Sequence, residues 1–280
     1  MHRLERLPAT SYFLVSAVFH YLGPSFAVLL FAHVSALGTA WLRIASAAVI
    51  FAVWRRPWRL IAGLDPPRRW LLGAMGAVLA AMNSLFYLAL ERLPLATVGA
   101  IEFLGVLGLA AAGARTPRNV AALVLAVGGV AALADVRFVG APLGFVFAAA
   151  NCVGFVLYVV LGHRMANSPG HNGIDLLAAA MLTAAVTATP LTVADAAPAL
   201  THPAWLIWGV AVGVCSSVIP YVADQLAMAR LPRATFALML CLLPATATVI
   251  GLLVLGQVPA GQEVAGIGLV IAGIAVHRPP

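Results

Sequence analysis

The sequence LALERLPLAT at residues 88–97 recurs as LAMARLPRAT at residues 226–235, 138 positions further along the chain. Seven of the ten positions are identical, including a core of Arg-Leu-Pro that is followed, one residue later, by Ala-Thr. Chance similarity in a sequence rich in alanine and leucine is the alternative explanation, and the shared core argues against it. We therefore interpret the two stretches as equivalent positions of an internal repeat.

The composition around these stretches is that of a membrane protein. Of 280 residues, 63% are apolar and 9% are charged, against about 25% charged in an ordinary soluble domain. A membrane-spanning helix needs about 20 mostly apolar residues, and ten such runs account for most of the chain. The first run is too long for a signal-peptide core and lacks a convincing cleavage site, so we expect it to be retained. The prediction is an all-α polytopic membrane protein with ten transmembrane helices, at residues 11–31, 35–54, 69–90, 94–113, 118–134, 141–163, 173–194, 204–228, 233–255 and 260–277.

The arginines indicate the orientation. All sixteen basic residues are arginines, and all but Arg43 lie in short segments between apolar runs rather than along one face, which argues against nucleic-acid binding. With the N-terminus in the cytoplasm, only Arg92 and Arg137 fall on the opposite side, and Arg43 lies within a span. Cytoplasmic segments of membrane proteins carry an excess of Lys and Arg, so we expect both termini to be cytoplasmic. The arginines on the cytoplasmic side are then Arg3, Arg6, Arg55, Arg56, Arg59, Arg68, Arg69, Arg115, Arg118, Arg164, Arg230, Arg233 and Arg278.

The repeat also predicts the domain organisation. One copy joins the third span to the fourth, and the other joins the eighth to the ninth. Because five spans per half is an odd number, the two copies should lie on opposite sides of the membrane. The expected domains are a first five-helix repeat at residues 1–137 and a second, inverted five-helix repeat at residues 138–280. Many secondary transporters alternate access on such inverted repeats.

Polar side chains within the spans mark a candidate substrate chamber. With a rise of 1.5 Å per residue, Arg43, Asn83 and Glu102 each lie about 12 Å from the outer ends of their helices. Asn151 falls near the midplane, and His20 lies beside a proline that should distort the first span. Such residues are costly in a bilayer unless they face a partner or a wet cavity. The alternative is a structural ion pair between Arg43 and Glu102, with the asparagines bonding helix to helix.

Two further helix faces carry candidate site residues. Phe155 and Tyr158 share one face of the sixth span with Asn151, and Tyr221 shares a face of the eighth span with Asp224. The aromatic face could wall a pocket, and core packing explains it about as well.

Glu102 and Asp224 are the candidate protonatable groups for coupling. Glu102 leads, because it is a lone carboxylate at the depth of the chamber. Asp224 lies about one turn from the cytoplasmic end of its helix, and its alternative role is that of an interfacial carboxylate near Arg230.

These motifs resemble those of the EamA-type transporters of the drug/metabolite transporter superfamily, and within them the bacterial threonine/homoserine exporter group. The resemblance implies ten helices in two inverted halves, a bacterial inner (plasma) membrane location, export of small metabolites that are often amino acids, and proton antiport. By position it supports Arg43, Asn83, Glu102 and Tyr158 as chamber residues, and Asp224 stands where that group has an acidic residue. The matching segments are Leu42-Arg43, Asn83-Ser84-Leu85-Phe86-Tyr87-Leu88 running into Leu93-Pro94-Leu95, Glu102-Phe103 with Gly105, Tyr158 with Gly162-His163-Arg164, and Pro220-Tyr221 running on to Arg230-Leu231-Pro232 and Thr235-Phe236.

The chain also departs from that group's pattern. Leu243 and Gln257 stand where the exporters usually have glutamates, and Val106 replaces a proline. Val28 stands at a position that is usually polar or basic, and Phe155 replaces a tryptophan. The lost carboxylates put identical ion coupling in doubt, and the fewer polar groups favour a more apolar or neutral substrate.

Three other functions are alternatives to transport of a small metabolite. An intramembrane enzyme would need a convergent catalytic set, and the sequence has no Gly-x-Ser-x-Gly, no His-Glu-x-x-His and no aspartate pair at matched depth. A flippase or exporter for an amphipathic or lipid-linked molecule, and a non-transporting membrane scaffold or receptor, remain open. The three cysteines lie in apolar runs without metal-ligand spacing, so we expect no metal and no cofactor. The expected partners are a small-molecule substrate, protons and the lipid bilayer, and the oligomeric state is left open.

Overall fold

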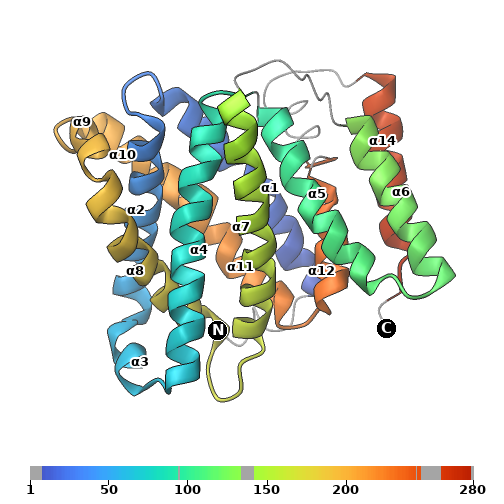
Figure 1. Ribbon diagram of the computed structural model, residues 1–280, viewed down its shortest axis with the longest axis horizontal. Helices are drawn as coiled ribbons and strands as arrows, with labels where there is room; N and C mark the ends of the chain where they lie inside the picture. Colours follow the sequence, from blue (N-terminus) through green and yellow to red (C-terminus); the bar gives the residue numbers. More distant parts are fainter. Residues whose placement is uncertain (1–7, 94, 134–141, 244, 247–259, 279–280) are drawn as a thin grey trace.

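The computed structural model describes residues 8–93, 95–133, 142–243, 245–246 and 260–278, and over these residues the chain is helical, without strands (Figure 1). Its helices are α1 (Ala9–Leu30), α2 (Ala36–Arg55), α3 (Trp58–Gly63), α4 (Pro66–Leu90), α5 (Leu95–Gly113), α6 (Pro117–Leu133), α7 (Pro142–Ala166), α8 (Gly173–Thr192), α9 (Ala197–Leu200), α10 (Pro203–Gly213), α11 (Ile219–Met228), α12 (Arg233–Leu240) and α14 (Gly261–Val276), with a 3-10 turn η2 (Ala194–Ala196) and a π-helical turn η3 (Val214–Val218).

Five of the described helices are long and apolar enough to cross a membrane: α2, α4, α7, α8 and the continuous segment Pro203–Met228. The last of these contains α10, η3 and α11 and corresponds to the eighth expected span. The ninth expected span begins with α12, but much of its remainder, together with Gln257, lies outside the described residues. The short helices α3 and α9 were not expected.

Local sequence explains where several helices begin and end. Prolines open α4, α6, α7 and α10, as expected for a first helical position that needs no amide hydrogen. Ser35 caps α2, since its hydroxyl oxygen accepts the Gly38 amide hydrogen at 3.2 Å. The same helix ends at Arg56, a left-handed residue with φ of 50°.

Packing between helices follows the order of the expected spans. Helices five spans apart lie together, namely α2 with α8, α5 with α12 and α6 with α14. The third span, α4, packs on the sixth, α7, while the first, α1, packs on the eighth, α11. Each span of the first half corresponds to the span five places later in the second half. The contact between the third and sixth spans therefore corresponds to the contact between the eighth and first spans. These five pairs of packed helices therefore map onto one another when the two halves are exchanged, although α5 also packs on α7 without an equally extensive α12–α1 contact among the described residues.

The two copies of the repeated sequence lie at opposite ends of α7. At its start, Gly144 packs so closely on the first copy that an added Cβ would lie 2.9 Å from the Cβ of Arg92. At its end, His163 Nε2 lies 3.1 Å from the carbonyl oxygen of Leu231 in the second copy. Because α7 has 25 residues, it spans about 37 Å, more than the roughly 30 Å of a bilayer core.

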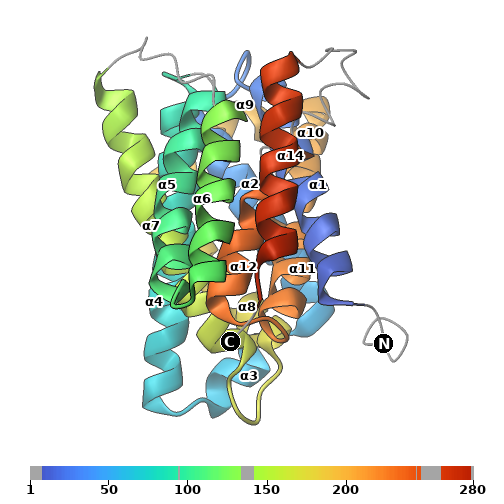
Figure 2. The same cartoon turned by 90° about the vertical axis from the view of Figure 1, so that its right-hand side faces the viewer.

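One end of the bundle gathers most of the arginines. Figure 2 shows α1 beginning and α14 ending at this lower end of the molecule. Here Arg55 pairs with Asp175, and Arg68 donates to the carbonyl oxygen of Pro169 after α7 at 3.0 Å. At the opposite end, Arg92 pairs with its neighbour Glu91.

The α6–α14 pair yields a test of helix packing. A Cβ added at Gly129 of α6 would lie 2.6 Å from Cγ2 of Val270 and 2.7 Å from the carbonyl oxygen of Gly266. At the neighbouring Gly128, the nearest atom would be Leu269 Cδ1 at 4.0 Å. Because overpacking of this kind costs about 1–3 kcal/mol, Gly129→Ala is expected to lower the thermal unfolding midpoint by several degrees. Gly128→Ala is the matched control, and equal midpoints for the two variants would contradict the close α6–α14 contact.

Candidate functional site

A small cavity lies among the helices and brings together residues from both halves of the chain. Its volume is about 40 Å³, which is room for about three water molecules. Seven of the eight predicted substrate-site residues line it, and Tyr158 does not. The lining residues are His20, Pro24, Arg43, Met82, Asn83, Phe86, Gly99, Glu102, Phe103, Asn151, Phe155, Ser216, Tyr221 and Leu243.

Arg43 of α2 is held in the cavity wall by three hydrogen bonds. Its Nε donates to the hydroxyl of Ser217 at 2.8 Å, and its Nη2 donates to the carbonyl oxygen of Ser216 at 2.7 Å and to the hydroxyl of Tyr221 at 3.1 Å. In a regular α-helix the Ser216 carbonyl would accept the amide hydrogen of residue 220. Pro220 has no such hydrogen, so Arg43 supplies the missing donor. The distortion expected at Pro220 is present as the π-helical turn η3.

Glu102 of α5 faces the same cavity and interacts with Asn151 of α7. The Nδ2 group of Asn151 donates to Oε1 of Glu102 at 3.0 Å. No oxygen of Glu102 lies within 4 Å of a nitrogen of Arg43 among the described residues, so the alternative of a structural Arg43–Glu102 ion pair is wrong for this conformation. The cavity therefore presents a cation and a carboxyl group that are not bound to each other.

Three polar atoms of the lining residues are buried without a hydrogen-bond partner among the described residues. They are Nδ1 of His20, Oδ1 of Asn151 and the hydroxyl of Ser216. Buried polar atoms are hydrogen-bonded in the great majority of proteins, and an exception needs an explanation. A polar ligand in the cavity would supply partners for these three atoms.

Asn83 of α4 and Tyr221 of α11 join the two halves across the cavity. The hydroxyl of Tyr221 donates to Oδ1 of Asn83 at 3.2 Å, and Nδ2 of Asn83 donates to the carbonyl oxygen of Leu79 at 2.6 Å. The two residues are 138 positions apart, the offset of the internal repeat. This hydrogen bond thus joins two residues whose separation equals that of the two copies of the repeated sequence.

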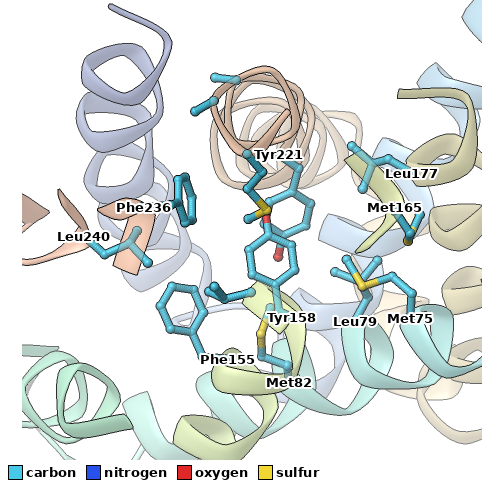
Figure 3. Packing of buried hydrophobic residues seen from close by; sticks show 14 of the residues in the cluster. Met75, Leu79, Met82, Phe155, Tyr158, Met165, Leu177, Tyr221, Phe236 and Leu240 are labelled. Carbon is cyan, nitrogen blue, oxygen red and sulfur yellow. The ribbon is translucent and has the colours of Figure 1, made fainter. Parts of the chain in front are cut away.

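An aromatic stack forms one side of the site. Figure 3 shows Tyr158 between Phe155 and Tyr221. The ring centroids of Phe155 and Tyr158 are 5.8 Å apart, and those of Tyr158 and Tyr221 are 5.1 Å apart. Phe155 and Tyr221 reach the cavity, whereas Tyr158 lies behind them as a support.

Asp224 lies outside the cavity lining and is fully buried. It accepts hydrogen bonds from the Ser16 hydroxyl at 2.6 Å and the Tyr158 hydroxyl at 2.8 Å, which tie α1 and α7 to α11. The alternative role of an interfacial carboxylate is therefore wrong, because the Asp224 side chain is buried inside the bundle. The hydrogen bonds of Asp224 thus join three helices on the arginine-rich side of the cavity.

Several lining residues were not predicted. The phenylalanine and methionine side chains look like ordinary core residues in the sequence, so no signal distinguishes them. Ser216 had a signal, because it lies four residues before Pro220 and its carbonyl must find a donor outside the helix. Leu243, which stands where the exporters usually have a glutamate, also lines the cavity, and its side chain makes this part of the wall apolar. The side chain of Val28 and the whole of Gln257 lie outside the described residues.

Comparisons with known proteins identify relatives of this chain. The sequence pattern of the EamA-like transporter family matches residues 142–277. The threonine/homoserine exporter RhtA of Salmonella typhimurium (strain LT2) is 33% identical over 270 residues, covering 92% of this chain and 88% of that protein. The protein of the same name from Escherichia coli (strain K12) is 32% identical, covering 89% and 84%. One solved structure, described only as a crystal structure of a protein, has the same fold, with a TM-score of 0.69, 21% identity, and coverage of 96% and 95%.

Proposed function

The chain belongs to the EamA-like transporter family, and on this basis we propose that it exports a small neutral amino acid or a related metabolite through the cavity around Arg43 and Glu102. It is a multi-pass protein of the bacterial inner membrane, and its relatives are transporters rather than enzymes. Two of these relatives are named as exporters of threonine and homoserine, which are small neutral amino acids with a hydroxyl group.

The observation that carries this proposal is the separation of opposite charges in one cavity. Arg43 and Glu102 both line it without forming an ion pair. An amino acid zwitterion also carries two opposite charges, on an ammonium and a carboxylate group attached to the same carbon. We place the substrate carboxylate at Arg43, because hydrogen bonds from a guanidinium group to a carboxylate are charge-assisted, and the ammonium group at Glu102 and the free Oδ1 of Asn151.

The rest of the lining favours a substrate side chain without charge. Met82, Phe86, Phe155 and Leu243 supply an apolar wall, where a second charge would be desolvated without a partner. The unpartnered hydroxyl of Ser216 and Nδ1 of His20 can meet a substrate hydroxyl.

Glu102 also supports coupling to protons. A carboxyl group that binds the substrate ammonium can bind a proton in its place, and the two compete for one site. Competition of this kind exchanges substrate for protons, which is the elementary requirement of antiport. Asp224 is the second proposed coupling group, because it links three helices on the arginine-rich side of the cavity.

The size of the cavity supports alternating access. A volume of about 40 Å³ holds about three waters, so an amino acid fits only after the helices separate. The described conformation is then a contracted state of the cycle.

The packing of the helices supports ten spans in two inverted repeats. Five pairs of packed helices map onto one another when the halves are exchanged, and the repeated sequence occurs at both ends of α7. The arginine-rich end, where α1 begins and α14 ends, is proposed to face the cytoplasm.

Counterflow in proteoliposomes tests the proposal. Purified protein is reconstituted with one unlabelled neutral amino acid inside, and uptake of labelled amino acids is measured with and without a pH gradient. Saturable exchange of threonine, homoserine or another small neutral amino acid is the expected result. Protein that is folded but exchanges no member of the panel would refute amino acid export and favour a flippase or a non-transporting scaffold.

Ser216→Ala is expected to reduce the preference for a hydroxylated substrate. The comparison is between threonine and 2-aminobutyrate, which differ by the hydroxyl group. A neutral hydrogen bond contributes about 1 kcal/mol, so the half-saturating concentration of threonine should rise about fivefold relative to that of 2-aminobutyrate. The second substrate is the control within each variant, and an unchanged ratio would place the substrate hydroxyl elsewhere.

A further inference from the structure

A second and larger cavity lies at the arginine-rich end of the bundle. It sits where the α5–α6 connection, the start of α12 and the end of the chain after α14 come together, and its volume is about 520 Å³. Its lining residues are Leu109, Ala112, Gly113, Arg115, Thr116, Arg118, Asn119, Arg233, Ala234 and Arg278. We call it the arginine pocket.

The arginine pocket has an unbalanced positive charge. Four arginines line it and no carboxylate does. Among the described residues, none of the four has a carboxylate oxygen within 4 Å, whereas Arg55 and Arg68 at the same end pair with Asp175 and Asp65. Such a concentration of charge around a hollow calls for an anion.

The chain holds this arrangement in place. Asn119 Nδ2 donates to the carbonyl oxygen of Arg278 at 2.9 Å, and the amide of Arg278 donates back to Oδ1 of Asn119 at 3.1 Å. Arg118 Nε donates to the carbonyl oxygen of Val276. These contacts fix the end of the chain against the start of α6.

Two helix N-termini add to the positive potential. α6 begins at Pro117 and α12 begins at Arg233, so both helices start beside the pocket. Helix N-termini attract anions through their unpaired amide groups and the helix dipole. The guanidinium groups add the planar donors that suit phosphate oxygens.

An apolar strip leads away from the arginines. Leu109 and Ala112 of α5 line the pocket within two turns of Arg115. A free phosphate would make no favourable contact with these apolar side chains, whereas the acyl chains of a phospholipid would pack along them. We propose that the arginine pocket binds the phosphate group of an anionic phospholipid, with the acyl chains directed along α5.

The general excess of arginine on cytoplasmic segments does not account for the pocket. That excess sets the number of arginines at one end of the bundle, but not their convergence from three separate segments on one hollow. Arg115, Arg233 and Arg278 come from the α5–α6 connection, the start of α12 and the segment after α14. Basic pockets between membrane helices are known to recognise lipid phosphates.

The test compares lipid binding by the full chain and two matched variants. Phosphatidylglycerol or phosphatidylcholine is titrated into protein in uncharged detergent micelles, and the thermal unfolding midpoint and lipid retention in native mass spectrometry are recorded. Glycerol 3-phosphate is titrated separately, as the soluble source of the same phosphate. The Arg115→Gln/Arg233→Gln variant removes two pocket charges and leaves the Asn119–Arg278 contacts intact. The control, Arg59→Gln/Arg164→Gln, removes two exposed arginines outside the pocket lining.

We expect phosphatidylglycerol, but not phosphatidylcholine, to raise the unfolding midpoint and to remain bound. Each arginine removed from the pocket should weaken this binding about fivefold, so the double variant should bind about 25-fold more weakly while the control binds as the unaltered chain does. Equal weakening in both variants, or none in the pocket variant, would overturn the site. Equally tight binding of glycerol 3-phosphate would overturn the assignment to a lipid. None of these measurements depends on transport, so they remain decisive whatever counterflow shows.

Discussion

Replacing Glu102 by glutamine is expected to abolish transport driven by a pH gradient, while exchange of substrate between the two sides continues. Glutamine has the shape of the protonated carboxylic acid, and its side-chain oxygen can still accept the hydrogen bond from Asn151 that Glu102 accepts at 3.0 Å. It cannot take up or release a proton. Flux that requires proton movement through this site should therefore fall to the background of empty vesicles.

The same substitution should weaken substrate binding. A hydrogen bond to a charged group contributes about 1.5–3 kcal/mol, so loss of the pairing with the substrate ammonium should raise the half-saturating concentration for exchange roughly 10- to 150-fold. Measuring exchange at high substrate concentration separates this effect from the loss of coupling.

Glu91→Gln is the matched control for this experiment. Glu91 is the exposed neighbour of Arg92 at the far end of the bundle, and its replacement should leave both measurements unchanged. If Glu102→Gln retained an unaltered pH-dependent flux, Glu102 would not be the coupling group and Asp224 would become the principal candidate.

The depth of the site could be predicted from the sequence because the helix rise is constant. Counting 1.5 Å per residue places Arg43, Asn83 and Glu102 at one level, and all three line the central cavity. The repeated sequence also predicts that its copies lie on opposite sides of the membrane, and in the structure they contact opposite ends of α7. Both predictions depend only on positions along helices, which the chain itself fixes.

Rotation about the helix axes could not be predicted in the same way. Opposite charges at one depth favour an Arg43–Glu102 ion pair, yet Arg43 turns toward Ser216, Ser217 and Tyr221 because a proline leaves a carbonyl without a donor. Asp224, near a helix end in the sequence, becomes fully buried because α1 and α7 cover it. Which side chains meet across the bundle depends on packing between distant segments.

Arg43→Lys is expected to reduce exchange about 100-fold and to destabilise the protein. Lysine keeps the positive charge but lacks the planar fork of arginine, so it cannot donate at once to the Ser217 hydroxyl, the Ser216 carbonyl and the Tyr221 hydroxyl. Loss of even one charge-assisted hydrogen bond costs about 1.5–3 kcal/mol, and the same geometry is lost for the substrate carboxylate. Exposed Arg59 supplies the control, since Arg59→Lys should change neither exchange nor the unfolding midpoint.

A second substitution separates the structural role of Arg43 from its role in transport. Alanine in place of Pro220 restores an amide hydrogen at the position from which a regular α-helix bonds the Ser216 carbonyl. The double variant Arg43→Lys/Pro220→Ala should therefore unfold at a higher temperature than Arg43→Lys alone, because one orphaned acceptor regains a donor. Its exchange should stay low, because lysine still lacks the planar set of donors with which a guanidinium group can bind the helix and the substrate carboxylate at once. If exchange instead recovered together with stability, Arg43 would be a structural residue that satisfies η3, and the substrate carboxylate would have to bind elsewhere in the cavity.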